Sequence, residues 1–397
     1  MAGSMRSRGK ESWELRVHAG RDPDTSRKQY VTRTVRGTKR EAARELARLV
    51  AQVDDGLVAA KAGTVGELCE RWYTQAQLDL SPAVADGYRR ILDRHVLPRW
   101  GSTSLRRLRT ADLDAWYAQL RERGAADGRS LAPNSVLRIH AVLHRALGQA
   151  VKWGWLTTNP AAATSPPRPK KHQIALPDPE DVLRLIAAAE RVNPELPAFL
   201  RLAAATGARR GELCALRWTD VDLERSHLTI SRGLVEAGGA VIEKDTKTHA
   251  ERRVTLDPGT VASLEQHRAR AGEVAKECGT KLGEEAFVFS HEVDGSVPWR
   301  PGYVTLAFTR LRDELGLTGL RLHDLRHFNA TNLLAAGTDV RTVSGRLGHA
   351  DASTTLNIYA HFLEQADERA ADALGAILGA PHQRHSAPGP ARPRRAE

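Results

Sequence analysis

Arginine and histidine side chains that could bind a phosphate lie at two places in the second half of the chain. Arg209 and Arg210 follow Thr-Gly-Ala at a predicted helix start. A guanidinium there, beside free backbone N–H groups, suits a phosphate. Farther on, "HDLRH" places His323 and Arg326 three positions apart, so both side chains lie on one helix face. Each feature alone is weak evidence, because an arginine at a helix start is common.

Two lysines and a tyrosine add groups that could transfer a proton or attack. Lys244 and Lys247 lie around the predicted turn of a β-hairpin, although most such lysines are simply solvated. In "LGHADASTTLNIYAHF", His349 follows a helix stop at Gly348, and Tyr359 comes later. Tyr359 alone is most simply an ordinary aromatic residue, because a phenol with a pKa near 10 attacks poorly unless another group accepts its proton.

A metal site is disfavoured by the residues around these groups. His323 and His327 have the spacing of two zinc ligands, but the nearby sequence has neither an H-E-x-x-H glutamate nor a cysteine. The three cysteines, Cys69, Cys214 and Cys278, are far apart and form no C-x-x-C pair. We therefore expect no metal, no cofactor and no disulfide framework, in a reducing compartment.

The overall charge favours a polyanionic partner. The 397-residue chain has a formal net charge of +11 and a pI of about 9.8. Lysines and arginines near phosphates release condensed counterions, which favours binding to nucleic acid. The N-terminus lacks the apolar core of a signal peptide, and no apolar run could span a bilayer. The sequence predicts a cytoplasmic protein without a membrane segment.

The elements that must position these groups begin with a small sheet and a helix. Residues 12–36 alternate apolar and basic side chains around a polar turn, which predicts two strands. Residues 39–53 have an apolar stripe at helical spacing. This basic module fits a minor DNA-binding unit or a solvated hairpin about equally well.

A helical bundle and a mixed α/β region follow. Residues 64–154 predict four helices, the first opened by a capping box at Thr64 and Glu67. The Pro-rich stretch 159–173 predicts a linker. From Ile174 the pattern predicts two helices, then strands, then mostly helix, ahead of a Pro-rich basic tail.

Together and in this order, the motifs resemble the tyrosine recombinases, in particular the phage-type integrases. The stretches "TGARRGEL…LRWTDVD", "TKTHAERRVTL", "HDLRH…LLAAG" and "LGHADASTTLNIYAH" match the family's boxes. The resemblance implies a multidomain, mainly α fold with small β-sheets (α+β). The expected parts are an arm-type DNA-binding module (1–60), a helical core-binding domain (61–158), a linker (159–173), a catalytic domain (174–380) and a disordered basic tail (381–397).

The resemblance also implies a mechanism. Tyr359 would attack a scissile phosphate and leave a 3′-phosphotyrosyl enzyme with a free 5′-hydroxyl, without ATP or a divalent metal. Arg209, chosen over Arg210 because it follows "TGA", and Arg326 would clamp the phosphate oxygens. His323 would accept the proton of the tyrosine. Lys247 would be the general acid, and it is preferred over Lys244 because it precedes "THAERRVTL". His349 would donate a hydrogen bond to the phosphate or the tyrosine.

Partners and rival functions follow from the same resemblance. The expected partners are double-stranded DNA with core and arm attachment sites, three further copies in a homotetramer, a directionality factor (excisionase) and a host DNA-bending protein. One rival is a non-catalytic regulator, because residues 323–348 could form a helix-turn-helix with Gly337 in the turn and Thr338 capping the second helix. A type IB topoisomerase is the closest enzymatic rival. The module over residues 12–53 favours an integrase over a chromosome-dimer resolving recombinase.

Overall fold

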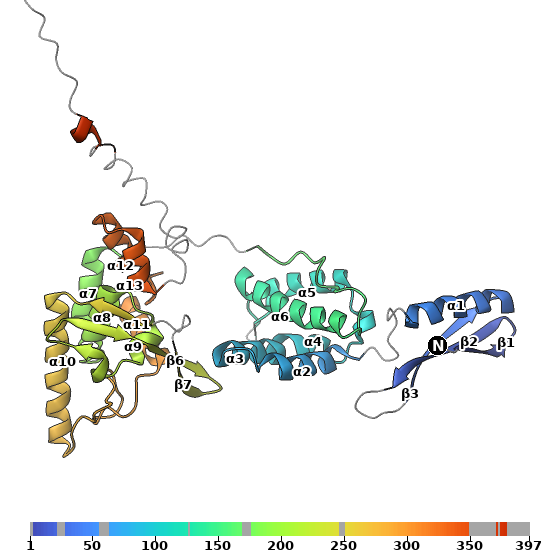
Figure 1. Ribbon diagram of the computed structural model, residues 1–397, viewed down its shortest axis with the longest axis horizontal. Helices are drawn as coiled ribbons and strands as arrows, with labels where there is room; N and C mark the ends of the chain where they lie inside the picture. The colour runs from blue at the N-terminus through green and yellow to red at the C-terminus, as the bar shows by residue number, and fades with distance from the viewer. Residues whose placement is uncertain are drawn as a thin grey trace, which may run out of the picture. The chain divides into compact units, whose positions relative to one another are not determined.

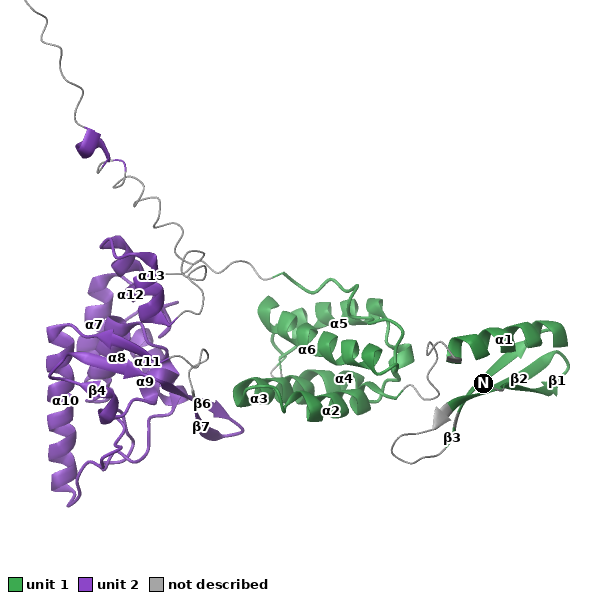
Figure 2. Cartoon of the chain, viewed as in Figure 1, with its two compact units in different colours: residues 1–172 green, residues 173–397 purple. Residues whose placement is uncertain are grey.

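The computed structural model describes residues 3–21, 28–54, 63–125, 128–168, 176–245, 251–348, 371 and 374–378. The chain forms two compact units, residues 1–172 and 173–397 (Figure 2). Helices dominate both units, and the strands of the described residues form three small sheets (Figure 1). The predicted fold class, mainly α with small sheets, is confirmed.

The first unit opens with an antiparallel sheet of β1 (Gly3–Gly9), β2 (Ser12–Arg21) and β3 (Lys28–Arg36). Helix α1 (Lys39–Asp54) lies along this sheet and shares its core (Figure 1). The sequence predicted β2, β3 and α1 but not β1. Strand β1 is exposed along most of its length and is held by backbone pairing with β2, which leaves no apolar alternation to read.

The same unit contains a helical bundle. Its helices are α2 (Val65–Ala76), α3 (Pro82–Ile91), η1 (Leu92–Val96), α4 (Leu97–Trp100), η2 (Leu105–Arg107), α5 (Thr110–Arg123) and α6 (Pro133–Lys152). The capping box of Thr64 and Glu67 is confirmed. The first residues of the predicted linker are held by this bundle, because Ala161 is buried in its core and the Ser165 N–H donates to Asp114 at 2.8 Å.

The second unit packs helices around two small sheets. Its elements are α7 (Pro179–Ala189), α8 (Leu196–Thr206), α9 (Arg210–Cys214), η3 (Trp218–Asp220), β4 (Val221–Asp222), β5 (His227–Ile230), β6 (Arg232–Ala237), β7 (Ala240–Asp245), β8 (Arg252–Thr255), α10 (Pro258–Glu277), α11 (Pro301–Glu314), α12 (Asp324–Ala335) and α13 (Val340–Leu347). Phe199, Phe289 and Trp299 meet in the core. None of the helices in the described residues is long and apolar enough to cross a membrane.

The strand pairing corrects the predicted hairpin. Strand β7 pairs with β6, and β8 pairs with β5. The tight turn lies at Gly238 and Gly239, whose φ angles of 57° and 81° favour glycine. Lys244 lies one residue before the end of β7, opposite Gly233, and Lys247 lies outside the described residues. The predicted pairing of the strands on either side of the two lysines was wrong, because β7 and β8 have different partners.

The cap of α13 is also corrected. Asp339, not Thr338, is the N-cap, and its carboxylate accepts the Thr342 N–H at 2.9 Å. A carboxylate at this position also interacts favourably with the helix dipole.

Candidate active site

Arg209 lies at the junction between α8 and α9. Helix α8 ends at Gly207, which has a left-handed φ of 63°, and a Cβ there would lie 2.5 Å from Leu347. Arg209 is the N-cap of α9. Its Nη1 ion-pairs with Glu212 at 2.9 Å, and its Nη2 donates to the Gly348 carbonyl at 3.4 Å. The Arg209 guanidinium thus lies between Glu212 and the Gly348 carbonyl.

Helix α12 supplies a second arginine, which hydrogen-bonds to the turn between α8 and α9. Arg326 is 4% exposed, and its Nη1 donates to the Gly207 carbonyl at 2.7 Å. One turn on, the Asn329 side-chain amide donates to the Ala204 and Ala205 carbonyls at 2.9 Å each. These bonds satisfy the last carbonyls of α8 and set Arg326 beside the start of α9.

His323 immediately precedes α12 and stands edge-on to His327, with 5.1 Å between ring centroids. The residue lies at the surface and lines a cavity. Partial desolvation lowers the pKa of His323 to about 4, and the neighbouring His327 and Arg326 lower it further. The ring is therefore neutral at physiological pH and can accept a proton.

The side chains of Arg209, His323 and Arg326 line one cavity of about 550 Å³ in the second unit. Of the described residues that line this cavity, Glu212 is the only one with a carboxylate. The basic lining residues are Arg209, Arg210, Lys244, Arg321, His323 and Arg326. An excess of fixed cations over anions makes this cavity a site for an anionic group.

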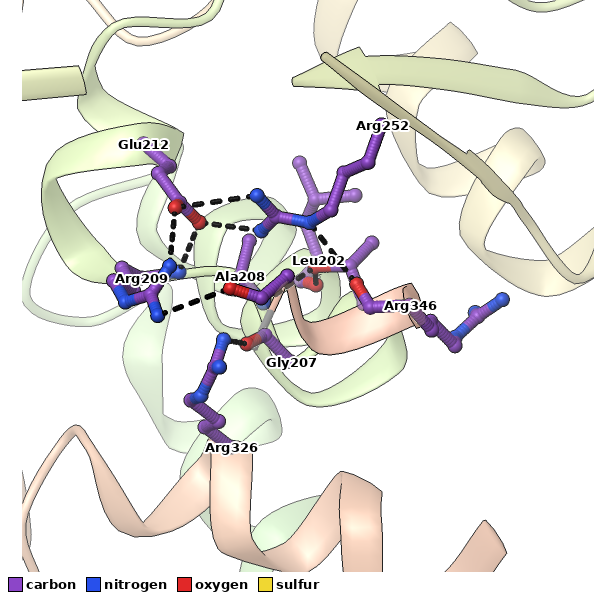
Figure 3. Close-up of polar contacts among 10 residues, drawn as sticks. Leu202, Gly207, Ala208, Arg209, Glu212, Arg252, Arg326 and Arg346 are labelled. Atoms are coloured by element: carbon purple, nitrogen blue, oxygen red, sulfur yellow. Dashed lines mark hydrogen bonds and ion pairs between the residues drawn. The ribbon is translucent and has the colours of Figure 1, made fainter. Parts of the chain in front are cut away.

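A buried carboxylate organises the arginines around the cavity (Figure 3). Glu212 accepts the Arg209 backbone N–H at 2.8 Å. Arg252 donates to both Glu212 oxygens, at 3.2 and 2.5 Å, and its Nε donates to the Arg346 carbonyl at 3.0 Å. Burial alone would raise the pKa of Glu212, but the hydrogen bonds and charges of Arg252 and Arg209 outweigh it and lower the pKa. Glu212 is thus an anion that the protein itself already neutralises.

Sequence reasoning missed Arg252, although a signal for it exists. Alternate residues of a strand share a face. Val254 and Leu256 are buried, whereas Arg253 and Thr255 are exposed. Arg252 belongs to the inward set, and an inward arginine requires a partner.

Of the six predicted site residues, the structure brings together Arg209, His323 and Arg326. The other three, Lys247, His349 and Tyr359, lie outside the described residues. Within the described ranges, no cluster of three or more His, Cys, Asp or Glu side chains could hold a metal ion.

Comparison with known proteins shows which family models match this chain and which solved structures share its fold. Residues 177–366 match the phage integrase family, and residues 64–121 match the SAM-like N-terminal domain of phage integrases. The ICEBs1 integrase of Bacillus subtilis is 24% identical, with 92% of this chain and 97% of that protein covered. The Tn1549 transposon integrase, solved with a circular intermediate DNA, has a TM-score of 0.64 at 18% identity, covering 77% of this chain and 99% of that one. A λ integrase tetramer solved on a Holliday junction has a TM-score of 0.54 at 20% identity, covering 88% and 96%.

Proposed function

The chain belongs to the phage integrase family of tyrosine recombinases, and on this premise we propose that it is a site-specific recombinase that integrates and excises a phage or mobile element. The reaction cleaves and rejoins DNA through a 3′-phosphotyrosyl intermediate. The observation that carries the proposal is the convergence of Arg209, His323 and Arg326 on one cation-rich cavity.

The geometry suits attack on a phosphodiester. Negative charge that builds up on the non-bridging oxygens would be stabilised by Arg209 and Arg326, whose guanidiniums are held in place before the substrate arrives. Neutral His323 would accept the proton of Tyr359, and Lys247 would protonate the leaving 5′-oxygen. His349 would hydrogen-bond the phosphate or the tyrosine oxygen. Cationic side chains supply the charge stabilisation, so the proposed mechanism uses no metal or cofactor.

A nicked suicide substrate tests the proposal directly. The core site, taken from the junction of an integrated element, carries a nick that lets the freed strand diffuse away after cleavage. The wild-type chain should accumulate a covalent protein–DNA adduct that survives denaturation and yields a DNA-linked peptide after proteolysis. Absence of any adduct with bound core DNA would remove the recombinase assignment and leave the DNA-binding regulator.

The geometry of α12 gives little support to the alternative hypothesis of a non-catalytic DNA-binding regulator. A helix-turn-helix would use residues 323–348 to dock on DNA, yet Arg326 is buried and directed to the Gly207 carbonyl. Relaxation of a supercoiled plasmid that lacks any attachment site would instead favour the topoisomerase.

The proposed general acid can be separated from its neighbour Lys244. Lys247→Ala should slow cleavage by about 10²–10⁴-fold, because the 5′-oxygen would leave without a proton. A substrate with sulfur as the bridging 5′ atom needs no proton on leaving and should restore most of that rate. Lys244→Ala, measured in parallel, should show no such selective recovery. The rates are measured as adduct formation at saturating enzyme. If only the Lys244→Ala variant recovered on the sulfur substrate, Lys244 would be the general acid.

The lowered pKa of His323 predicts that the rate of adduct formation changes little as the pH falls below neutral. A base with a pKa of about 4 stays unprotonated as the pH falls to about 5.5, whereas an unshifted imidazole would lose about tenfold in its neutral form by then. The rate of adduct formation at saturating DNA should therefore hold down to about pH 5.5 and fall only as the pH approaches 4. A decline centred near pH 6.5 that is absent in His323→Gln would contradict this assignment.

We further propose a homotetramer acting on two duplexes with core and arm sites in the cytoplasm, aided by an excisionase and a host DNA-bending protein. The support is the λ integrase tetramer on a Holliday junction and the separate basic sheet module at the N-terminus.

Deletion of residues 1–60 checks the proposed arm-binding role. The truncated chain should retain core-site adduct formation within about threefold, because its cavity residues lie in the second unit, but should lose integration. A plasmid integration assay beside the suicide-substrate assay measures both. Full integration by the truncated protein would refute the role of this module.

A further inference from the structure

We propose that Arg252 is a positioning residue for the phosphate clamp: it neutralises Glu212 so that the charge of Arg209 remains available to the scissile phosphate. The inference rests on the proposed function and extends it to a residue outside the cavity lining. The three side chains form the centre of the network in Figure 3.

Burial separates the two arginines that share Glu212. The side chain of Arg209 is 37% exposed, whereas those of Arg252 and Glu212 are 10% and 7% exposed. Arg209 lines the cavity and Arg252 does not. A phosphate can therefore reach Arg209, while Arg252 faces protein atoms.

Charge balance shows why a second arginine matters. Glu212 pairs with Arg209 through one oxygen at 2.9 Å and with Arg252 through both, at 3.2 and 2.5 Å. The two guanidiniums and the one carboxylate leave one net positive charge. That charge is available at Arg209, which is the most exposed of the three side chains. If Arg252 lost its charge, Glu212 would compete with the phosphate for Arg209 in a poorly solvated site, where unbalanced charges interact strongly.

Arg252 also fixes the far side of the cluster. Its Nε donates to the Arg346 carbonyl at 3.0 Å, and a Cβ on Gly348 would lie 2.9 Å from its Nη1. Gly348 has a left-handed φ of 67°, so this packing depends on glycine. By contrast, the Arg209 contact to the Gly348 carbonyl is 3.4 Å, a weak bond that a phosphate can replace. Arg252 therefore keeps its contacts when DNA binds, whereas Arg209 can exchange its contact to the Gly348 carbonyl for one to the phosphate.

A double-mutant cycle tests this electrostatic role. Arg252→Gln should slow adduct formation by about 100-fold at saturating DNA, because Glu212 then holds Arg209. Adding Glu212→Gln removes the competing anion, and the double variant should regain at least about tenfold. A merely structural role predicts that the rate follows the stability of the fold, because Glu212→Gln also removes a buried carboxylate that Arg252→Gln leaves short of its counter-charge. Thermal melts of both variants therefore accompany the rates, and recovery of the rate without a matching recovery of the melting temperature supports the electrostatic role. A double variant slower than, or equal to, the Arg252→Gln single variant would overturn the proposal.

A change of substrate provides a second readout. With a neutral methylphosphonate at the scissile position, less charge must be stabilised, so the defects of Arg209→Gln and Arg252→Gln should both shrink by at least about tenfold. Arg253→Gln, on the exposed face of the same strand, is the matched control and should cleave both substrates like wild type. A defect of Arg252→Gln that is equal on both linkages would overturn the proposal. Failure of the proposed function is distinct, because the wild-type chain would then form no adduct on the ordinary phosphate.

Discussion

Replacing Tyr359 by phenylalanine is expected to abolish the covalent protein–DNA adduct while leaving core-site binding intact. The substitution removes one oxygen atom, which in the proposed mechanism is the nucleophile. Loss of a nucleophile costs far more than loss of a supporting contact, so the rate of adduct formation should fall by at least about 10⁴-fold. Denaturing gels of a nicked suicide substrate measure the adduct, and band shifts of the same DNA measure binding.

Tyr303 offers a matched control for this substitution. Its hydroxyl accepts a hydrogen bond from the Asn193 side chain at 2.9 Å, and its ring packs on Trp299. Tyr303→Phe removes the same atom from the same unit and should keep adduct formation within about threefold, at a cost of about 1 kcal/mol in stability. An undiminished adduct with Tyr359→Phe, mapped by peptide sequencing to another residue, would mean that the nucleophile had been assigned wrongly.

Replacing Arg326 by lysine is expected to reduce strand cleavage by about 10²–10³-fold although the charge is kept. The guanidinium donates to the Gly207 carbonyl with one nitrogen, and in the proposed mechanism it also contacts the scissile phosphate in the cavity that it lines. A single ammonium cannot span both partners with the same planar geometry. Single-turnover cleavage at saturating DNA, beside a thermal melt, separates lost chemistry from lost folding.

Arg310, exposed on α11, is the control for lysine replacement as such. Arg310→Lys should cleave like wild type. If Arg326→Lys retained full cleavage at saturating DNA, the phosphate clamp would have to consist of Arg209 and other cavity cations, and the proposed role of Arg326 would be withdrawn.

The helices were the most predictable part of the fold. The capping box at Thr64 and Glu67 and the apolar stripes of α1 and α6 are local signals, and the helices form where those signals lie. Strand pairing was less predictable. The stretch of β7 and β8 predicted a hairpin with its turn around Lys244 and Lys247, but β7 pairs with β6 across a tight turn at Gly238 and Gly239, and β8 pairs with β5.

The sequence by itself determined which reactive groups this chain carries and in what order, because the motifs around Arg209, His323 and Arg326 are contiguous and their residue types limit the chemistry. Only the tertiary structure decided which charges share a partner. Glu212 and Arg252 lie 40 positions apart. Strand alternation marks Arg252 as the inward arginine, but nothing local says which carboxylate it will meet. That selection follows from the pairing of β8 with β5 and the packing of α13 on β8, since a buried charge is stable only where the fold places its counter-charge.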